Sequence, residues 1–239
     1  MIHFVTFGDS SYYNSLKRIY NEAKNLNIFD NILIITNKDL ENKSPIFWKK
    51  HNKFISNNSR GYGYWLWKSF IILKTIQGIS ENDILVYADS GCTLNKNGLN
   101  KMNEYLDIIK KSKNGILSFE TTFFEKQYTK RDLFEYLKMN NEVFLNSNHL
   151  IATAFILRKC ENTTKLVSEW YDTCCIYNLL DDSPSSLKND ELFIEHRHDQ
   201  SIFSLLRKKY GTEIIPDETF FSNFKSEGII YPIWATRLK

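Results

Sequence analysis

The chain has 239 residues, of which 42% are hydrophobic and 25% are charged, and its formal net charge is +3. Such a length and composition are typical of an ordinary globular protein, and we expect residues 1–239 to form a single domain. The small net charge argues against nucleic acid as the main partner, although it leaves room for a local basic patch that faces an anionic ligand.

Short apolar runs alternate with longer amphipathic stretches, which indicates βαβ units. The predicted fold class is therefore α/β, with a mostly parallel central sheet flanked by helices. In chain order we expect a strand at 2–7, a helix that buries Leu16, Ile19, Tyr20 and Ala23, a strand at 31–36, a helix from about 63 to 76, a strand at 84–88, a helix at 99–109, strands at 115–119 and 151–157, a helix at 163–177, a loop at 180–186 and a last helix that starts near Asp199.

The first expected strand runs into Phe7-Gly8-Asp9-Ser10. A glycine at this point lets a ligand approach the backbone closely, and Ser10 or Ser11 can cap the helix that follows. The segment is not Gly-x-Gly-x-x-Gly, so the fingerprint of dinucleotide binding is absent. A plain strand-to-helix turn explains these residues equally well.

The segment from Arg60 to Lys68, Arg-Gly-Tyr-Gly-Tyr-Trp-Leu-Trp-Lys, combines two glycines, four aromatic residues and two cations. Aromatic faces can stack on a base or a sugar, and the cations can neutralise phosphate. The alternative is that Tyr64, Trp65 and Trp67 only pack in the core.

The strand at 84–88 is apolar without alternation, as in a strand that is covered on both faces, and it ends in Asp89, Ser90 and Gly91. Ligands of open α/β sheets bind outside the carboxyl ends of the strands. Asp89 is thus expected to meet a ligand or a metal ion, which indicates an enzyme for a phosphorylated substrate. The alternative is a turn in which Asp89 binds its own loop backbone.

The segment Glu195-His-Arg-His-Asp199-Gln200 precedes the last expected helix. His196 and His198 have a spacing that can ligate a metal ion if the segment is extended, although no cysteine or further histidine supports a zinc site. Asp199 can be a general base, a group that stabilises positive charge, or the N-cap of the helix.

Cysteine usage and hydropathy bear on the location of the protein. The four cysteines include no Cys-x-x-Cys pair, and the adjacent Cys174 and Cys175 are poor disulfide partners, which favours a reducing compartment. No apolar run approaches the roughly 20 residues that span a bilayer, and the first residues lack the pattern of a signal peptide. We expect a soluble, cytoplasmic protein (in the host cytoplasm if viral), with peripheral membrane contact left open.

Together these segments resemble nucleotide-sugar-dependent glycosyltransferases of the GT-A fold, and in particular small bacterial and viral polysaccharide enzymes. The likeness rests on Arg-Gly-x-Gly-x-Trp-x-Trp-Lys at 60–68, a strand that ends in Asp-Ser-Gly at 89–91, and His-Arg-His-Asp-Gln-Ser at 196–201. It implies a Rossmann-like GT-A domain that moves a sugar from a nucleoside-diphosphate sugar to a glycan or another hydroxyl acceptor.

The resemblance also implies a donor site. Asp89 corresponds to the first acid of the Asp-x-Asp motif, but Gly91 stands where that motif usually supplies its principal metal ligand. Mn²⁺ or Mg²⁺ would then rest on Asp89 and His198, or would be dispensable if Lys68 and Arg237 stabilise the leaving diphosphate. The residues expected to bind the donor are Thr6, Phe7, Gly8, Arg60, Tyr64, Lys68, Asp89, Ser90, Gly91, His198, Gln200 and Arg237.

Asp199 is the carboxylate that we expect beside the anomeric carbon. It would be the base of an inverting enzyme or would stabilise an oxocarbenium-like centre in a retaining one. The segment 118–148, rich in Phe, Tyr and Glu, is the expected acceptor pocket, with an ordinary helical insertion as the alternative. Two other functions stay open: a sugar nucleotidyltransferase, for which the loop after the first strand lacks a cation, and a non-catalytic module that binds a carbohydrate or nucleotide.

Overall fold

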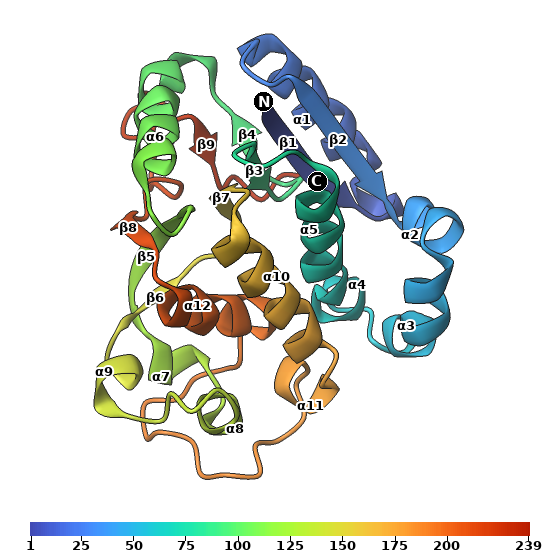
Figure 1. Ribbon diagram of the computed structural model, residues 1–239, viewed down its shortest axis with the longest axis vertical. Coiled ribbons are helices and arrows are strands. Elements are labelled where there is room, and N and C mark those ends of the chain that lie inside the picture. The colour runs from blue at the N-terminus through green and yellow to red at the C-terminus, as the bar shows by residue number, and fades with distance from the viewer.

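The computed structural model describes all residues, 1–239, and has a central sheet of seven strands (Figure 1). Along the sheet lie β2 (Asn31–Thr36), β1 (Ile2–Gly8), β3 (Ile84–Ala88), β7 (Ala154–Arg158), β5 (Ile116–Phe124) and β6 (Asn148–Leu150), and β8 (Glu213–Pro216) pairs with β5. Strands β1, β2, β3, β5 and β8 point in one direction, and β6 and β7 run opposite to them. The predicted α/β class with a mostly parallel sheet is confirmed.

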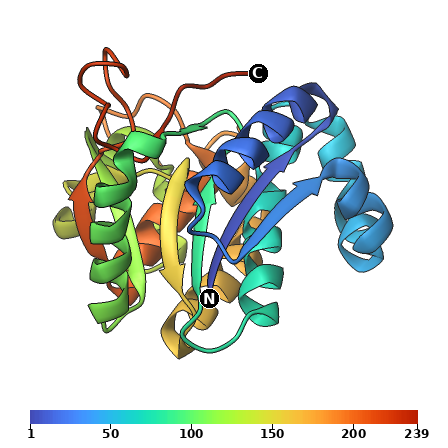
Figure 2. The same cartoon turned by 90° about the horizontal axis from the view of Figure 1, so that it is seen from above.

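Helices cover both faces of this sheet (Figure 2). A separate two-stranded ladder joins β4 (Thr93–Leu94) to β9 (Ile233–Trp234), near the end of the chain. None of the helices is both long and apolar enough to cross a membrane. The helices are α1 (Tyr13–Leu26), α2 (Asn37–Lys43), α3 (Pro45–Asn57), α4 (Gly61–Tyr64), α5 (Leu66–Gly78), α6 (Leu99–Lys111), α7 (Glu125–Tyr128), α8 (Arg131–Tyr136), α9 (Glu142–Leu145), α10 (Glu161–Cys174), α11 (Tyr177–Leu180) and α12 (His198–Tyr210), with 3₁₀ turns at Ser10–Tyr12 and Lys96–Gly98.

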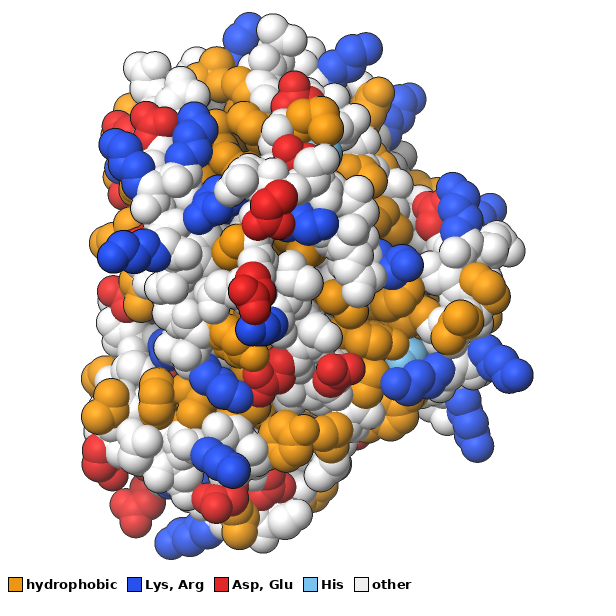
Figure 3. Space-filling model, viewed as in Figure 1, with side chains coloured by type: hydrophobic (Ala, Val, Ile, Leu, Met, Phe, Trp, Pro, Cys, Tyr) orange, Lys and Arg blue, Asp and Glu red, His pale blue; other side chains and the backbone are white.

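The central position of strand β3 explains why its sequence is apolar without alternation. Leu85 and Tyr87 pack into the core that also buries α5, α10 and α12, whereas Ile84, Val86 and Ala88 pack into the core under α1 and α6. Side chains on both faces of the strand are therefore buried, as expected for a central strand between two helical layers. On the surface, basic and acidic side chains are interspersed over the face shown in Figure 3, in line with the small net charge.

Two expected elements differ from the structure where the chain meets the candidate site. The helix expected from about residue 63 begins at Leu66, because residues 61–65 have positive φ. The strand expected at 151–157 begins only at Ala154, as β7, because residues 151–153 form a break that separates it from the preceding strand β6. In this break the N–H of Ala152 donates to the side-chain Oε1 of Gln200 at 3.0 Å, so the backbone leaves the sheet ladder toward α12.

Other boundaries also shift. Strand β5 continues to Phe124 rather than ending at 119, and the helix expected at 163–177 ends at Cys174 before the separate turn α11. Helices α2 and α3 were not predicted. Helix α3 carries the corresponding signals, since Pro45 occupies its first turn and Phe47, His51 and Ile55 repeat at a spacing of four and are buried.

Candidate active site

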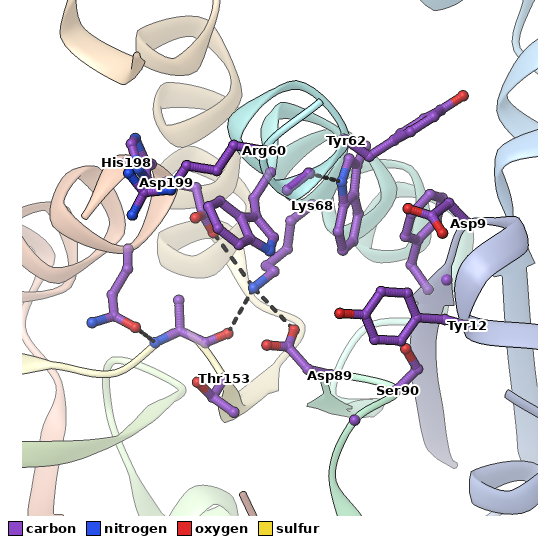
Figure 4. A pocket seen from close by; sticks show the side chains of 18 of the residues that line it. Asp9, Tyr12, Arg60, Tyr62, Lys68, Asp89, Ser90, Thr153, His198 and Asp199 are labelled. Atoms are coloured by element: carbon purple, nitrogen blue, oxygen red, sulfur yellow. Dashed lines mark hydrogen bonds and ion pairs between the residues drawn. The ribbon is translucent and has the colours of Figure 1, made fainter. Parts of the chain in front are cut away.

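A cavity of about 670 Å³ opens beyond the carboxyl ends of β1 and β3 (Figure 4). Its walls come from distant parts of the chain: the residues after β1, the turn around α4, the turn after β3, the break before β7, the start of α12 and the last residues. Ligands of open α/β sheets bind at this edge. We therefore take the cavity as the candidate active site.

Nearly all of the predicted site residues meet in this cavity. Thr6 and Tyr64 are the exceptions. Thr6 is fully buried in β1, where its hydroxyl has no hydrogen-bond partner, and Tyr64 packs on the ring of His198 with 4.7 Å between the ring centroids. The predicted residues that line the cavity are Phe7, Gly8, Arg60, Lys68, Asp89, Ser90, Gly91, His198, Asp199, Gln200 and Arg237.

The cavity also has lining residues that we did not assign to the site. Some of them, such as Asp9, Tyr62 and Arg197, lie inside segments that the sequence had already singled out. Tyr12, Thr153 and Lys239 had no local signal, because only the tertiary fold brings them together. The unassigned lining residues include Asp9, Tyr12, Tyr62, Trp65, Thr153, Glu195, Arg197 and Lys239.

Lys68 connects two carboxylates in this cavity (Figure 4). Its Nζ lies 3.0 Å from Oδ1 of Asp89 and 3.6 Å from Oδ2 of Asp199, and it donates a hydrogen bond of 3.2 Å to the carbonyl oxygen of Ala152. Burial alone would lower the pKa of Lys68, but Asp199 and Asp89 outweigh it and the pKa is raised. Since all three ammonium hydrogens have acceptors nearby, this arrangement favours a positioning role over the direct donor contact that we expected.

Asp199 lies in the first turn of α12, and its side chain is 4% exposed. Burial is the main cause that raises its pKa, from the usual 3.8 to about 7, while Lys68 acts in the opposite direction. Its Oδ2 has no hydrogen-bond partner. The N-cap position of α12 is Arg197, so the interpretation of Asp199 as a cap is wrong. A buried carboxylate that titrates near neutrality is suited to accept a proton.

The turn after β3 is held in place from several sides. Oδ1 of Asp89 accepts a hydrogen bond of 2.7 Å from the hydroxyl of Tyr87, and Arg18 donates to the carbonyl oxygens of Ser90 and Cys92 at 3.0 and 2.8 Å. The side chain of Asp89 accepts no hydrogen bond from its own loop backbone, so the alternative of a self-capping turn is wrong. The backbone N–H groups at 90 and 91 donate to no protein acceptor.

Gly91 has a packing reason to lack a side chain. Its carbonyl oxygen accepts hydrogen bonds of 2.9 Å from the N–H of Leu238 and from the hydroxyl of Thr236. A Cβ at this position would lie 3.3 Å from the Cα of Arg237 and from the carbonyl oxygen of Leu238. The last residues of the chain thus occupy the space into which a second acid of an Asp-x-Asp motif would project.

Residues 61–65 form a left-handed turn that builds another wall. The N–H groups of Tyr64 and Trp65 donate to the carbonyl oxygens of Arg60 and Gly61, at 2.8 and 3.1 Å. Each non-glycine residue in this conformation costs roughly 1–2 kcal/mol, and such strain persists where the surrounding packing enforces it, frequently at functional sites. The φ angles are +59° at Gly61, +54° at Tyr62, +84° at Gly63, +51° at Tyr64 and +59° at Trp65.

The two histidines near α12 differ in their hydrogen bonding. Nε2–H of His196 donates to the carbonyl oxygen of Leu179 at 2.9 Å, and its Nδ1 accepts from the N–H of Lys130 at 3.3 Å, so both ring nitrogens are satisfied. Nδ1–H of His198 donates to the carbonyl oxygen of Leu180 at 2.8 Å, and its buried Nε2 makes no hydrogen bond, with Oδ1 of Asp182 3.6 Å away. His198 also stacks on Trp65, with 5.5 Å between the centroids.

The residues present do not form a metal-binding set. No three His, Cys, Asp or Glu side chains converge on one point. Oδ1 of Asp89 already accepts from Tyr87 and lies 3.0 Å from the Lys68 ammonium, and Gly91 offers no side-chain ligand. The pairing of Asp89 with His198 on Mn²⁺ or Mg²⁺ therefore stays a prediction without geometric support, and we derive no step through a metal ion.

The opposite end of the cavity combines aromatic rings with a carboxylate, Asp9, Tyr12 and Tyr62 (Figure 4). Oδ1 of Asp9 accepts from the N–H and the hydroxyl of Ser11 at 2.8 and 2.6 Å. Asp9 is thus the cap of the following turn, in place of the predicted Ser10 or Ser11. Its second oxygen, Oδ2, has no partner within the protein.

The fold can be compared with known proteins. No protein-family model and no curated protein matches the sequence. Among solved structures, a glycosyltransferase involved in glycosylation of the major capsid of PBCV-1 superposes with a TM-score of 0.53 and 9% identity, over 98% of this chain and 91% of that one. Apo GlyE, a glycosyltransferase of Streptococcus pneumoniae TIGR4, superposes with a TM-score of 0.50 and 12% identity, over 98% of this chain and 54% of that one.

The chain has a GT-A fold. Because the identities are only 9% and 12%, these two structures show the fold of the chain and not its activity. The activity of a protein with this fold depends on the residues of its cavity.

Proposed function

We propose that residues 1–239 form one GT-A glycosyltransferase domain, which moves a sugar from a nucleoside-diphosphate sugar to the hydroxyl of a glycan or another acceptor. The observation that carries this proposal is the position of Asp199. Its buried carboxylate, with one oxygen that makes no hydrogen bond, lies in the same cavity as the turn after β3 and is joined to that turn through the ion pairs of Lys68.

In this proposal the nucleoside part of the donor binds at the end of the cavity formed by Asp9, Tyr12 and Tyr62. A base can stack on a tyrosine ring, and the free Oδ2 of Asp9 can accept a hydrogen bond from a base N–H. Burial raises the pKa of Tyr62 to about 12, so its ring stays neutral beside the acids.

The diphosphate binds between the turn after β3 and the last residues of the chain. The N–H groups at 90 and 91 have no protein acceptor and can donate to phosphate oxygens, as in other anion sites made of backbone amides. Arg237 and Lys239 line the same cavity and supply positive charge. In this proposal these two cations, with the amides, stabilise the leaving diphosphate.

The sugar of the donor binds at the end of the cavity that contains Asp199. Two buried atoms, Oδ2 of Asp199 and Nε2 of His198, make no hydrogen bond and have only charged groups 3.6 Å away, and each unsatisfied acceptor costs about 1–3 kcal/mol. Sugar hydroxyls are donors that would satisfy them, whereas an ionised phosphate has no hydrogen to give. Oε1 of Gln200 accepts from the backbone, which leaves the amide hydrogens of its side chain free for sugar or phosphate oxygens.

The reaction that follows is substitution at the anomeric carbon. The acceptor oxygen forms a bond to that carbon, the bond from the carbon to the diphosphate oxygen breaks, and the electron pair leaves with the diphosphate. In an inverting reaction Asp199 takes the acceptor proton. In a retaining reaction Asp199 stabilises positive charge at the sugar, and the leaving diphosphate takes the acceptor proton. Lys68 keeps Asp199 and Asp89 in place without contacting the substrate.

A thermal-shift panel of UDP, GDP and dTDP and their sugars, with and without Mn²⁺, tests the donor site. We expect at least one nucleotide to raise the Tm and Asp89→Ala to remove the shift. If no nucleoside diphosphate stabilises the protein in either condition, the proposal is wrong. Asp199→Asn separates an enzyme from a binding module, because an enzyme loses sugar transfer or donor hydrolysis while the nucleotide shift is retained.

A further inference from the structure

Arg197 is a cation held in a fixed position without a hydrogen-bond partner for its side chain. Its guanidinium carbon lies 3.6 Å from the centroid of the Tyr128 ring and 5.6 Å from that of Phe123. Its backbone N–H donates to the carbonyl oxygen of Tyr128 at 3.1 Å, which fixes the residue against α7. Arg197 is one of the residues that line the cavity, two residues before Asp199. A stacked guanidinium with free N–H groups is preorganised to donate to ligand oxygens.

The charges around Arg197 are balanced. Oε1 of Glu195 lies 3.6 Å from Nε of Arg197, and Oε2 lies 3.5 Å from a guanidinium nitrogen of Arg60, which also pairs with Asp182 at 3.2 Å. Two cations therefore face two carboxylates, and this wall has no net charge to attract an anion. Glu195 is partly exposed and accepts one long hydrogen bond, of 3.5 Å from Arg60, so its carboxylate can still accept from a ligand beside the guanidinium of Arg197.

Beside this pair, β5 presents aromatic surface to solvent. Phe123 is 43% exposed, and its ring meets Tyr128 edge-on with 5.3 Å between the centroids. An exposed aromatic face next to polar groups is typical of a binding surface, since the apolar face of a ligand can cover the ring while its polar edge reaches the charged side chains. A sugar ring combines these two properties in one molecule.

We propose that Phe123, Arg197 and Glu195 form the acceptor subsite, and that it takes a neutral sugar ring. The C–H face of the sugar packs on Phe123, and its hydroxyls donate to Glu195 and accept from Arg197. This inference rests on the proposed function, because it places the accepting hydroxyl next to Asp199. It narrows the acceptor from any hydroxyl compound to uncharged sugars.

The test measures transfer from the nucleotide sugar that gives the largest thermal shift. The acceptor probes are methyl glycosides of glucose, galactose and mannose, compared with methyl glucuronide and glucose 6-phosphate. We expect at least one neutral glycoside to be used about tenfold more efficiently, in kcat/KM, than either anionic probe. Preference for an anionic probe, or transfer to none of the neutral probes, overturns the inference.

Variants then test the residues. Phe123→Ala and Arg197→Gln should each raise the acceptor KM about tenfold or more. The matched controls are Tyr136→Ala, which removes an exposed aromatic ring from α8, and Lys165→Gln, which removes an exposed cation from α10; both should leave the KM within twofold. If Phe123→Ala and Arg197→Gln leave the acceptor KM unchanged, and the nucleotide still raises the Tm, the acceptor subsite is wrong but the proposed function is not. A wild-type protein with no nucleotide shift instead marks failure of the proposed function.

Discussion

Lys68 and Asp199 lie 3.6 Å apart, measured from Nζ to Oδ2, although one belongs to α5 and the other to α12. Both side chains are less than 5% exposed, and Asp89 is the third member of the cluster. Lys68 is closer to Asp89, at 3.0 Å, which is consistent with the raised pKa of Asp199. The buried ammonium of Lys68 thus forms ion pairs with two carboxylates, and the protonation of Asp199 depends on how strongly Lys68 interacts with each of them.

Lys68→Met should destabilise the protein strongly. The change keeps much of the side-chain volume but leaves two carboxylates without their cation, and removal of one partner of a buried ion pair typically costs about 3–5 kcal/mol. Urea unfolding at neutral pH measures the loss. Lys74→Met, on an exposed face of the same helix, is the control and should change the free energy of unfolding by at most about 0.5 kcal/mol. Equal effects of the two substitutions would contradict the role given to Lys68.

Asp199 should make stability and activity depend on pH in opposite directions. Because its folded pKa of about 7 lies above the usual 3.8, the folded state binds more protons between these values. The stabilising contribution is complete below pH ~4 and is lost as the pH rises through ~7. If Asp199 must be ionised to act, kcat/KM should rise up to tenfold per pH unit below ~7 and level off above it.

Unfolding curves and rates measured from pH 5 to 8 check this prediction. Asp199→Asn should flatten the stability profile over that range and abolish transfer. A stability profile with the same slope in the variant would show that another group titrates there.

Gly91→Asp should weaken nucleotide binding rather than create a metal site. The new side chain would meet the backbone of Arg237 and Leu238 and displace the residues that bring cations to the cavity. We expect roughly tenfold weaker binding of the nucleoside diphosphate, about 1.4 kcal/mol, by titration calorimetry. Gly78→Asp is the control, since a Cβ at Gly78 has no atom within 4 Å. Tighter binding in Gly91→Asp when Mn²⁺ is added would mean that the acid completes a metal site after all.

Gly61→Ala should disturb the left-handed turn. Gly61 has φ of +59°, and a Cβ there would fall 2.4 Å from the ring of Trp65. The strain alone costs about 1–2 kcal/mol, and the clash with Trp65 adds to it. Thermal unfolding and the nucleotide shift should both decrease, whereas Gly78→Ala should leave them unchanged. A Gly61→Ala protein that retains wild-type Tm and nucleotide binding would contradict the placement of this turn.

The sequence alone was sufficient for much of the fold, because local patterns carry the information. The unbroken apolar run of β3 reflects burial on both faces, and the amphipathic period of α1 and α6 reflects burial on one. The polar residues at the strand ends indicated the edge of the sheet at which the cavity lies. The left-handed turn at 61–65 could not be foreseen from propensity, because tertiary packing holds Tyr62, Tyr64 and Trp65 in a conformation that is locally unfavourable.

The segments that line the site could be identified from their residues, since each carries its own mixture of glycine, aromatic and charged side chains. The tertiary fold sets how those side chains interact with one another. In the fold, Lys68 forms ion pairs with Asp89 and Asp199, and the last residues of the chain fill the space beside Gly91. The fold also places Tyr12, Thr153 and Lys239 in the lining of the cavity. The physical reason is that hydrogen bonds, burial and pKa depend on distances between residues far apart in sequence, which no local pattern records.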